Sequence, residues 1–276
     1  MMKNYLILLL AFIPLFSIQA TEFEPYTMPN TQVVPIKNHH QHGQYELLIK
    51  LPDEYDKDPK RRFPVIYYTD AVWHIDFLTS TTRFLMEDAI LVGISWQKDI
   101  DKASKAESGE YASRFRDYTA ISSKDKVRQS KYQFGQAKLH LAFIRDEVIP
   151  KVEKLYRTLP QQRTYFGYSL GGQFGVYALA AQPDTFNHYI LGSPALGGSV
   201  DYLSELLSKQ KQLKANVFIS YGDQEARLKT HVDALLSKLK AHKQSHLSLT
   251  HEVMEGDHTQ AVPMTVARGI SWLSNL

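Results

Sequence analysis

The chain has no cysteine among its 276 residues. Disulfide bonds and metal sites built on thiolates are therefore excluded, and so is lipid attachment at a cysteine. Its apolar run near the start, residues 5–16, is too short for a membrane-spanning helix, which needs roughly 20 residues. Internal repeats and low-complexity linkers are also absent. With 43% apolar residues, the chain is expected to bury the core of one domain.

Residues 1–20 have the pattern of a secretory signal peptide. Lys3 supplies the positive start, residues 5–16 supply the apolar centre, and Ser17-Ile18-Gln19-Ala20 resembles a cleavage site. We therefore expect an exported mature chain, a single domain of residues 21–276, with no membrane anchor. The pattern does not distinguish a periplasmic from a secreted protein.

One polar segment has a local charge excess as large as the net charge of the whole chain, +3. Residues 98–131 contain nine basic and six acidic residues. This basic excess either attracts an anionic ligand or belongs to a solvated surface loop. Residues 98–133 show no clear period, which predicts a long irregular loop. Within it, Arg116 is a candidate substrate clamp, or it pairs with Asp117 and pins the loop. The basic residues lack the interleaved aromatics of nucleic-acid modules, so no nucleic-acid partner is expected.

Apolar runs and helical periods alternate along the rest of the chain. Strands are predicted near residues 45–51, 64–68, 90–94, 164–166, 217–221 and 247–253. Helices are predicted over 136–156, with a kink at Pro150, and over 172–182, 203–213, 228–242 and 261–273. This order predicts an α/β fold with a doubly wound, mostly parallel sheet and helices on both faces.

The pentapeptide Gly167-Tyr168-Ser169-Leu170-Gly171 lies between a predicted strand and a predicted helix. That context is typical of a nucleophile elbow, in which a tight strand-to-helix turn projects a serine hydroxyl away from the sheet. The N-terminus of the helix points N–H groups toward any oxyanion formed there. Ser169 is therefore a candidate nucleophile.

A catalytic serine needs a base and an acid that orients the base, and in such hydrolases they follow the serine in the order acid, then histidine. His258 lies in a glycine-flanked loop after a predicted strand, as a general base would. Glu225 or Asp223, after the preceding strand, is the candidate acid, and the spacing from Gly222 favours Glu225. Asp257 adjoins His258 in sequence and is a poor orienter.

The other histidines have simpler interpretations. His74 follows Trp73 in a predicted loop and could line a pocket. Three more histidines fall in helical patterns and are expected at the surface: His140, His231 and His242. The N-terminal group could bind a metal, but a solvated loop explains it better because no carboxylate shares its spacing: His39, His40 and His42.

From residue 51 to the end, the chain resembles the putative esterase family of α/β hydrolases. The resemblance is carried by residues 143–150, by Leu155-Tyr156-Arg157-Thr158, by the elbow with Gly172, and by Ser193-Pro194-Ala195-Leu196. Residues 92–94 and Arg116-Asp117-Tyr118-Thr119 are similar to the ferric-siderophore esterase branch. The resemblance implies the α/β-hydrolase fold and a serine esterase acting on a small-molecule ester without a cofactor or metal.

The resemblance also assigns roles to residues. It supports Ser169, His258 and Glu225 as the triad, with Leu170 and either Ala71 or Val72 as oxyanion donors. Substrate contacts are expected from Arg116, Tyr168 and Trp73. The implied substrate is a ferric siderophore trilactone; the alternatives are a general or carbohydrate-linked carboxylesterase and an acyltransferase of the same fold. A binding protein without catalysis is disfavoured because the serine, the histidine and the elbow glycines are all present.

Overall fold

A computed structural model describes residue 24 and residues 26–241 and 245–276. The predicted signal peptide therefore lies outside the described residues. The described chain forms one eight-stranded sheet in the order β1-β2-β4-β3-β5-β6-β7-β8. The strands are β1 Thr31–Asn38, β2 Gly43–Lys50, β3 Phe63–Tyr68, β4 Ile90–Ile94, β5 Thr158–Tyr168, β6 His188–Gly192, β7 Leu213–Gly222 and β8 Ser245–Met254.

Ten α-helices are described along the chain. They are α1 Ala71–Leu85, α2 Lys102–Ser108, α3 Ser113–Asp117, α4 Lys126–Tyr132, α5 Ala137–Phe143, α6 Ile149–Leu155, α7 Leu170–Ala181, α8 Val200–Lys209, α9 Ala226–Ala241 and α10 Ala261–Leu273. A 3₁₀ turn, η1, covers Tyr55–Lys57, and a π-helical turn, η2, covers Ile144–Val148. None of the described helices is long and apolar enough to cross a membrane.

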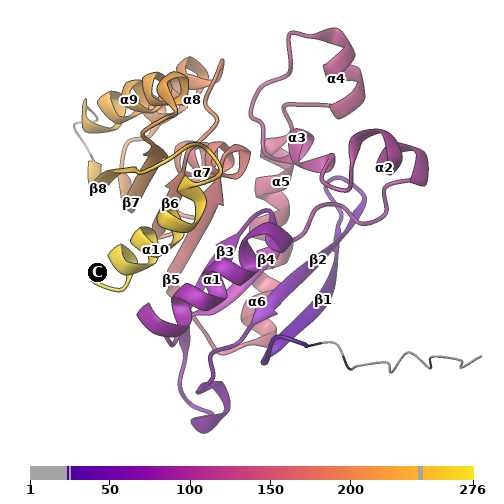
Figure 1. Ribbon diagram of the computed structural model, residues 1–276, viewed down its shortest axis with the longest axis vertical. Coiled ribbons are helices and arrows are strands. Elements are labelled where there is room, and N and C mark those ends of the chain that lie inside the picture. The colour runs from indigo at the N-terminus through magenta and orange to yellow at the C-terminus, as the bar shows by residue number, and fades with distance from the viewer. Residues whose placement is uncertain (1–23, 25, 242–244) are drawn as a thin grey trace, which may run out of the picture.

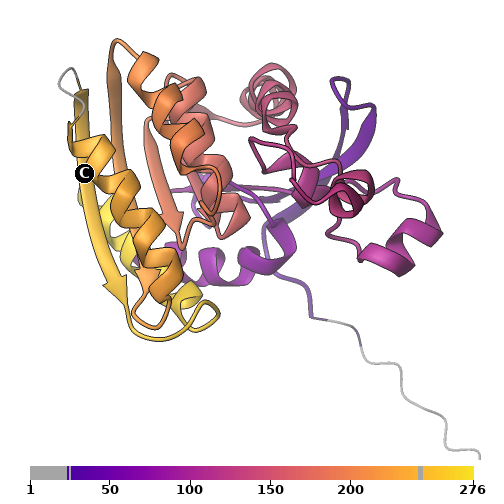
Figure 2. The same ribbon diagram turned by 90° about the horizontal axis from the view of Figure 1, so that it is seen from above.

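The helices cover both faces of the sheet, as predicted. Helices α1 and α10 pack side by side on one face, while α6, α7, α8 and α9 cover the other (Figures 1 and 2). Strands β3 to β8 run parallel, and only β1 and β2 are antiparallel to their neighbours. The predicted α/β fold with a doubly wound, mostly parallel sheet is confirmed.

The parallel strands are apolar on both sides because each side faces a helical layer. In β3, Tyr67 belongs to the larger core cluster and Tyr68 to the smaller one, which α1 and α10 cover. Phe166 and Phe218 extend the smaller cluster along β5 and β7. Successive side chains therefore fill the two layers in alternation.

Several predicted elements differ from the structure in their bounds. The predicted irregular loop over 98–133 is wrong, because this segment holds α2, α3 and α4, which project on the β1 and β2 side (Figure 1). The helix over 136–156 is interrupted before Pro150 by the π turn, in which the Ile149 N–H bonds to the Ile144 carbonyl five residues back. Proline lacks the N–H that would continue the normal ladder. Helix α8 ends at Lys209, because β7 already begins at Leu213.

Two histidine predictions are also wrong. His140 was expected at the surface but is fully buried among aromatic rings, including those of Tyr118 and Phe174. Trp73 and His74 were expected in a loop but belong to the first turn of α1, where His74 is buried. His242 lies outside the described residues.

The parallel strands place their carboxyl ends along one edge of the sheet. The turns after β3, β5, β6, β7 and β8 meet there and carry Ala71, Ser169, Ser193, Glu225 and His258, respectively. In doubly wound sheets this edge is where ligands and catalytic groups collect.

Candidate active site

Ser169 occupies the turn between β5 and α7 with φ 57° and ψ −116°, a conformation that non-glycine residues rarely adopt. Gly167 permits the tight turn, because a Cβ there would lie 2.3 Å from the Gly171 carbonyl oxygen. The Ser169 hydroxyl is partly exposed and makes no hydrogen bond with any residue that the structure describes. It is therefore free to meet a ligand.

Glu225 and His258 contact each other directly. Glu225 Oε1 lies 2.5 Å from His258 Nδ1, although the two residues follow different strands. The other carboxylate oxygen, Oε2, accepts the Gly222 N–H at 2.7 Å. The Glu225 side chain is 7% exposed and that of His258 is 47% exposed. A buried carboxylate therefore orients a half-exposed imidazole through Nδ1, and Nε2 is the ring nitrogen that does not face the carboxylate.

The two other acidic candidates have structural roles. Asp223 Oδ1 accepts the Gly256 N–H at 2.9 Å and so joins the two loops. Asp257 Oδ1 accepts the N–H groups of Gln260 and Thr259, which hold the pKa of its carboxyl below the usual range. Neither contacts the His258 imidazole.

Two further hydroxyl groups join Glu225 to the rest of the site. Ser193 Oγ lies 2.6 Å from Glu225 Oε2 and 2.8 Å from the Tyr168 hydroxyl. The Tyr168 hydroxyl also donates to the His258 carbonyl oxygen at 2.7 Å. Tyr168 was predicted as a substrate contact. It is only 4% exposed, and its hydroxyl is paired with Ser193 and the His258 carbonyl.

The predicted oxyanion donors are each at the beginning of a helix. Leu170 is the first residue of α7, and Ala71 and Val72 are the first two of α1, so their N–H groups have no acceptor inside the helix. Thr69 connects the two turns: its hydroxyl lies 3.0 Å from that of Tyr165, which donates to the Gly171 carbonyl at 2.8 Å.

Asp70 holds the turn before α1 and was not predicted. It is fully buried in a left-handed conformation with φ 54°. Arg114 donates to its two carboxylate oxygens, from Nε and Nη2, at 2.9 Å each. Trp96 Nε1 donates to Oδ1 at 2.6 Å. Asp70 thereby ties α3 to the turn that carries Ala71.

Trp73 lies beside this turn and forms an aromatic cluster with Trp96 and Tyr111. The ring centroids of Trp73 and Trp96 are 4.7 Å apart, and those of Trp73 and Tyr111 are 5.6 Å apart. The Arg114 guanidinium lies 4.9 Å from the Trp73 ring centroid. Trp73 is 45% exposed, so part of its ring is open to a ligand.

Arg116 is paired within the protein. Its Nε donates to Asp117 Oδ1 at 2.8 Å, and its Nη2 donates to the Tyr45 hydroxyl at 2.9 Å. The pairing alternative for Arg116 and Asp117 is therefore present in the structure. Arg116 also lines an open groove of about 890 Å³ between α2, α3 and α4, whose charged lining mixes both signs: Asp99, Asp101, Glu107, Lys126 and Lys131.

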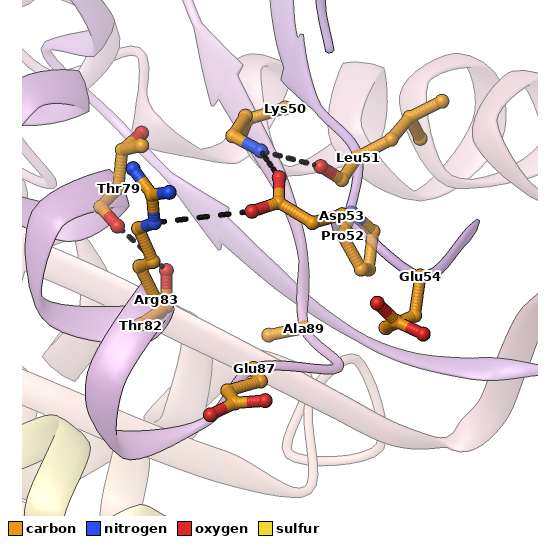
Figure 3. A pocket seen from close by; sticks show the side chains of 10 residues that line it. All are labelled: Lys50, Leu51, Pro52, Asp53, Glu54, Thr79, Thr82, Arg83, Glu87 and Ala89. Carbon is orange, nitrogen blue, oxygen red and sulfur yellow. Dashed lines mark hydrogen bonds and ion pairs between the residues drawn. The ribbon is translucent and has the colours of Figure 1, made fainter. Parts of the chain in front are cut away.

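A second pocket, of about 220 Å³, lies at the opposite edge of the sheet (Figure 3). Lys50, at the end of β2, and Arg83 both point toward Asp53, at 3.0 and 3.8 Å, and Ala89 immediately precedes β4. The hydrogen bond from Lys50 lowers the pKa of Asp53. The pocket is thus separate from the turns that carry Ser169, Glu225 and His258.

Among residues 24, 26–241 and 245–276, no group of three or more histidine, aspartate or glutamate side chains is arranged to hold a metal ion. His39 and His40 instead pair with carboxylates of the π turn: His39 with Glu147 at 2.8 Å and His40 with Asp146 at 3.1 Å. These contacts were missed because the partners are about a hundred residues apart in sequence.

A family model described as "Putative esterase" matches residues 40–268 of the chain. The chain belongs to the putative esterase family. This enzyme is therefore a carboxylic ester hydrolase, as its sequence predicted.

The esterase is similar to several named proteins. It is 23% identical to "Ferri-bacillibactin esterase BesA" of Bacillus subtilis (strain 168) over 269 residues, which covers 89% of this chain and 90% of the relative. Two solved structures superpose with a TM-score of 0.75 at 22% identity: the BES protein from Bacillus cereus and an IroE-like serine hydrolase from Shewanella oneidensis. They cover 93% and 89% of this chain, and 99% and 80% of their own lengths. These names agree with the predicted resemblance to siderophore esterases.

Proposed function

We propose that this esterase uses Ser169 as its nucleophile, His258 as its general base and Glu225 as the acid that orients the base. The observation that carries the proposal is the 2.5 Å contact between Glu225 and His258 Nδ1, at the same sheet edge as the strained Ser169 turn. Nδ1 faces the carboxylate, so Nε2 is left to exchange protons with the serine.

The reaction proceeds in two halves. His258 Nε2 takes the Ser169 proton while Oγ bonds to the ester carbonyl carbon, and the N–H groups of Leu170 and Ala71 stabilise the oxyanion. The carbon–oxygen bond to the leaving group breaks, and His258 returns the proton to the departing alcohol. Water then loses a proton to His258 and attacks the acyl group, which releases the acid and restores Ser169.

We propose a ferric siderophore lactone as the substrate. The support comes from the relatives, one of which is named a ferri-bacillibactin esterase, and from the nine basic against six acidic residues over 98–131. The contact to an aromatic part of the substrate is assigned to the exposed Trp73 ring. Arg116 lines the neighbouring groove and is the assigned basic contact, although Asp117 and Tyr45 already hold it.

We propose further that the enzyme acts outside the cytoplasm. The support is the signal-peptide pattern of residues 1–20. Hydrolysis of a ferric siderophore there would release iron after the complex has been captured.

Hydrolysis of a ferric siderophore trilactone and of p-nitrophenyl butyrate, each with the wild type and with Ser169→Ala and Ser169→Gly, tests the function. Glycine suits the left-handed turn, so the pair separates loss of the hydroxyl from backbone strain. We expect both variants to lose at least about a thousandfold in kcat on both esters. Retained turnover would contradict the nucleophile assignment.

The two substrates separate the finer possibilities. A serine-dependent preference for the trilactone supports the siderophore role. Cleavage of the simple ester alone keeps the triad and removes that role, and transfer of the acyl group to an added sugar would identify an acyltransferase.

A further inference from the structure

We propose that Ser193 is a positioning residue that couples the nucleophile turn to the Glu225–His258 pair. The proposal rests on the function proposed above, because it assigns a role relative to those three residues. Ser193 is fully buried in the turn after β6, and its hydroxyl contacts Glu225 and Tyr168 and not the Ser169 hydroxyl or the His258 ring. Its role is therefore indirect.

The segment around Ser193 first holds the main chain of Ser169. The Gly192 carbonyl accepts the Ser169 N–H at 2.9 Å, and the Ala195 N–H donates to the Ser169 carbonyl at 3.0 Å. The residues on either side of Ser193 thus fix the peptide groups of the nucleophile, whose backbone is already in a rare conformation.

The side chain of Ser193 then holds the acid. Its Oγ lies 2.6 Å from Glu225 Oε2, while Glu225 Oε1 faces the imidazole. Ser193 itself has φ 38°, and its N–H donates to the Ser220 carbonyl of β7 at 2.7 Å. One short segment therefore contacts both the nucleophile and the acid.

The contacts form a closed ring. It runs from the His258 imidazole through Glu225, Ser193 and Tyr168 back to the His258 carbonyl oxygen. Burial raises the pKa of Tyr168, so its hydroxyl keeps its proton.

A count of protons assigns the donors in this ring. A carboxylate and a carbonyl only accept, so the two hydroxyl protons must serve three contacts. Ser193 donates to Glu225, and the Tyr168 proton is shared between Ser193 Oγ and the His258 carbonyl. Ser193 is thus the side-chain donor that aligns the carboxylate, and removal of its hydroxyl leaves Glu225 Oε2 with the Gly222 N–H alone.

Ser199 offers a matched control from the same connection after β6. It is also fully buried, and its Oγ accepts from Gln173 Nε2 and donates to the Leu196 carbonyl, both at 2.9 Å. It contacts none of the triad side chains. Ser199→Ala therefore removes an equally buried hydroxyl without touching the ring.

The experiment compares Ser193→Ala, Ser193→Gly and Ser199→Ala with the wild type. The measurements are kcat and KM on p-nitrophenyl butyrate, the rate of Ser169 labelling by a fluorophosphonate, and the Tm. We expect both Ser193 variants to lose about 10- to 100-fold in kcat and in labelling rate, with little change in KM, because a hydrogen bond to a charged group is lost. Ser199→Ala should lower Tm and leave kcat near the wild-type value.

Wild-type kcat in both Ser193 variants would overturn the proposal. So would a fall in Ser193→Ala alone, because glycine tolerates the left-handed φ and the loss would then come from the backbone. Ser169→Ala is measured in parallel. If it is inactive while the Ser193 variants are normal, only this inference fails; if it is active, the proposed function itself fails.

Discussion

Backbone strain is concentrated at the candidate site. Six non-glycine residues of the described chain have a positive φ, and three of them are Asp70, Ser169 and Ser193. Each such conformation costs on the order of 1–3 kcal/mol and persists only where surrounding contacts impose it. Here Asp70 has Arg114 and Trp96, and Ser193 has Glu225 and Tyr168. The esterase therefore maintains local strain where it also arranges the proposed catalytic groups.

Another residue with a measurable energetic cost is His140. Both of its ring nitrogens lack a hydrogen-bond partner in the described part of the chain, and burial lowers its pKa from 6.5 to about 4. Above about pH 6.5 both folded and unfolded states carry the neutral ring. As the pH falls toward 4, His140 becomes protonated in the unfolded chain but stays neutral in the folded chain, so the free energy of unfolding falls. The loss attributable to His140 is about 3 kcal/mol.

We therefore expect His140→Phe to flatten the fall in unfolding free energy between pH 6.5 and 4, measured by urea denaturation. His74 contributes a similar slope, because burial also lowers its pKa to about 4, so the variant should remove about half of the combined effect. His246→Gln, at an exposed position, is the control and should keep the wild-type slope. An unchanged slope in His140→Phe would contradict the assignment.

At the scale of elements, α3 supports the beginning of α1. The Arg114 side chain is 11% exposed and that of Asp70 fully buried, and they form a two-point ion pair. Breaking such a pair leaves a buried charge without compensation, which is more damaging than removing both partners. Helix α3 is thereby coupled to the turn that carries Ala71.

Arg114→Gln should destabilise the fold by about 3 kcal/mol and also lower kcat, because Ala71 directly follows Asp70. The measurements are the Tm and kcat on p-nitrophenyl butyrate. Arg163→Gln is the matched control: Arg163, in the middle of β5, pairs with Glu153 of α6, with side chains 22% and 27% exposed. Its loss should be about 1 kcal/mol or less, with normal kcat. Equal effects of the two variants would argue against a special role for α3.

The elements that sequence predicted best are those with local signals. Strand β4 and helix α10 begin and end at the predicted residues, since their apolar patterns are complete in themselves. Strand β1 was missed because it is an edge strand with an exposed Val33 and an internal Pro35. Helix α1 was missed because its Thr-rich middle, residues 79–82, weakens the helical pattern.

The candidate site likewise contains features with a local sequence signal and contacts between residues that are distant in sequence. The Ser169 turn is a local motif, so its position could be read from five residues. The choice between Glu225 and Asp223 needed the loop after β8, since the His258 imidazole contacts the first and the Gly256 N–H the second. The contacts of Asp70 with Arg114 and of Ser193 with Glu225 carry no local signal, because the partners are 44 and 32 residues apart.

For the whole molecule, the absence of cysteine means that the proposed export would not depend on disulfide formation. When residues 1–276 are expressed in a bacterium with a periplasm, we expect the exported protein to begin at Thr21, because cleavage follows the small residue Ala20. Intact-mass measurement of the periplasmic fraction checks this. The variant Ala20→Arg should not be cleaved. If the unmutated chain stays in the cytoplasm at full length, the prediction is contradicted.

The residues of the proposed triad follow strands at different positions in the sheet. Ser169 follows β5, which is enclosed by β3 and β6, whereas His258 follows β8, which has a neighbour on one side only. Edge strands are commonly among the first segments to exchange amide hydrogens through partial opening. A brief detachment of β8 would displace His258, the proposed base, while the Ser169 turn stayed folded. On heating, this esterase would thus lose turnover reversibly before its core melts.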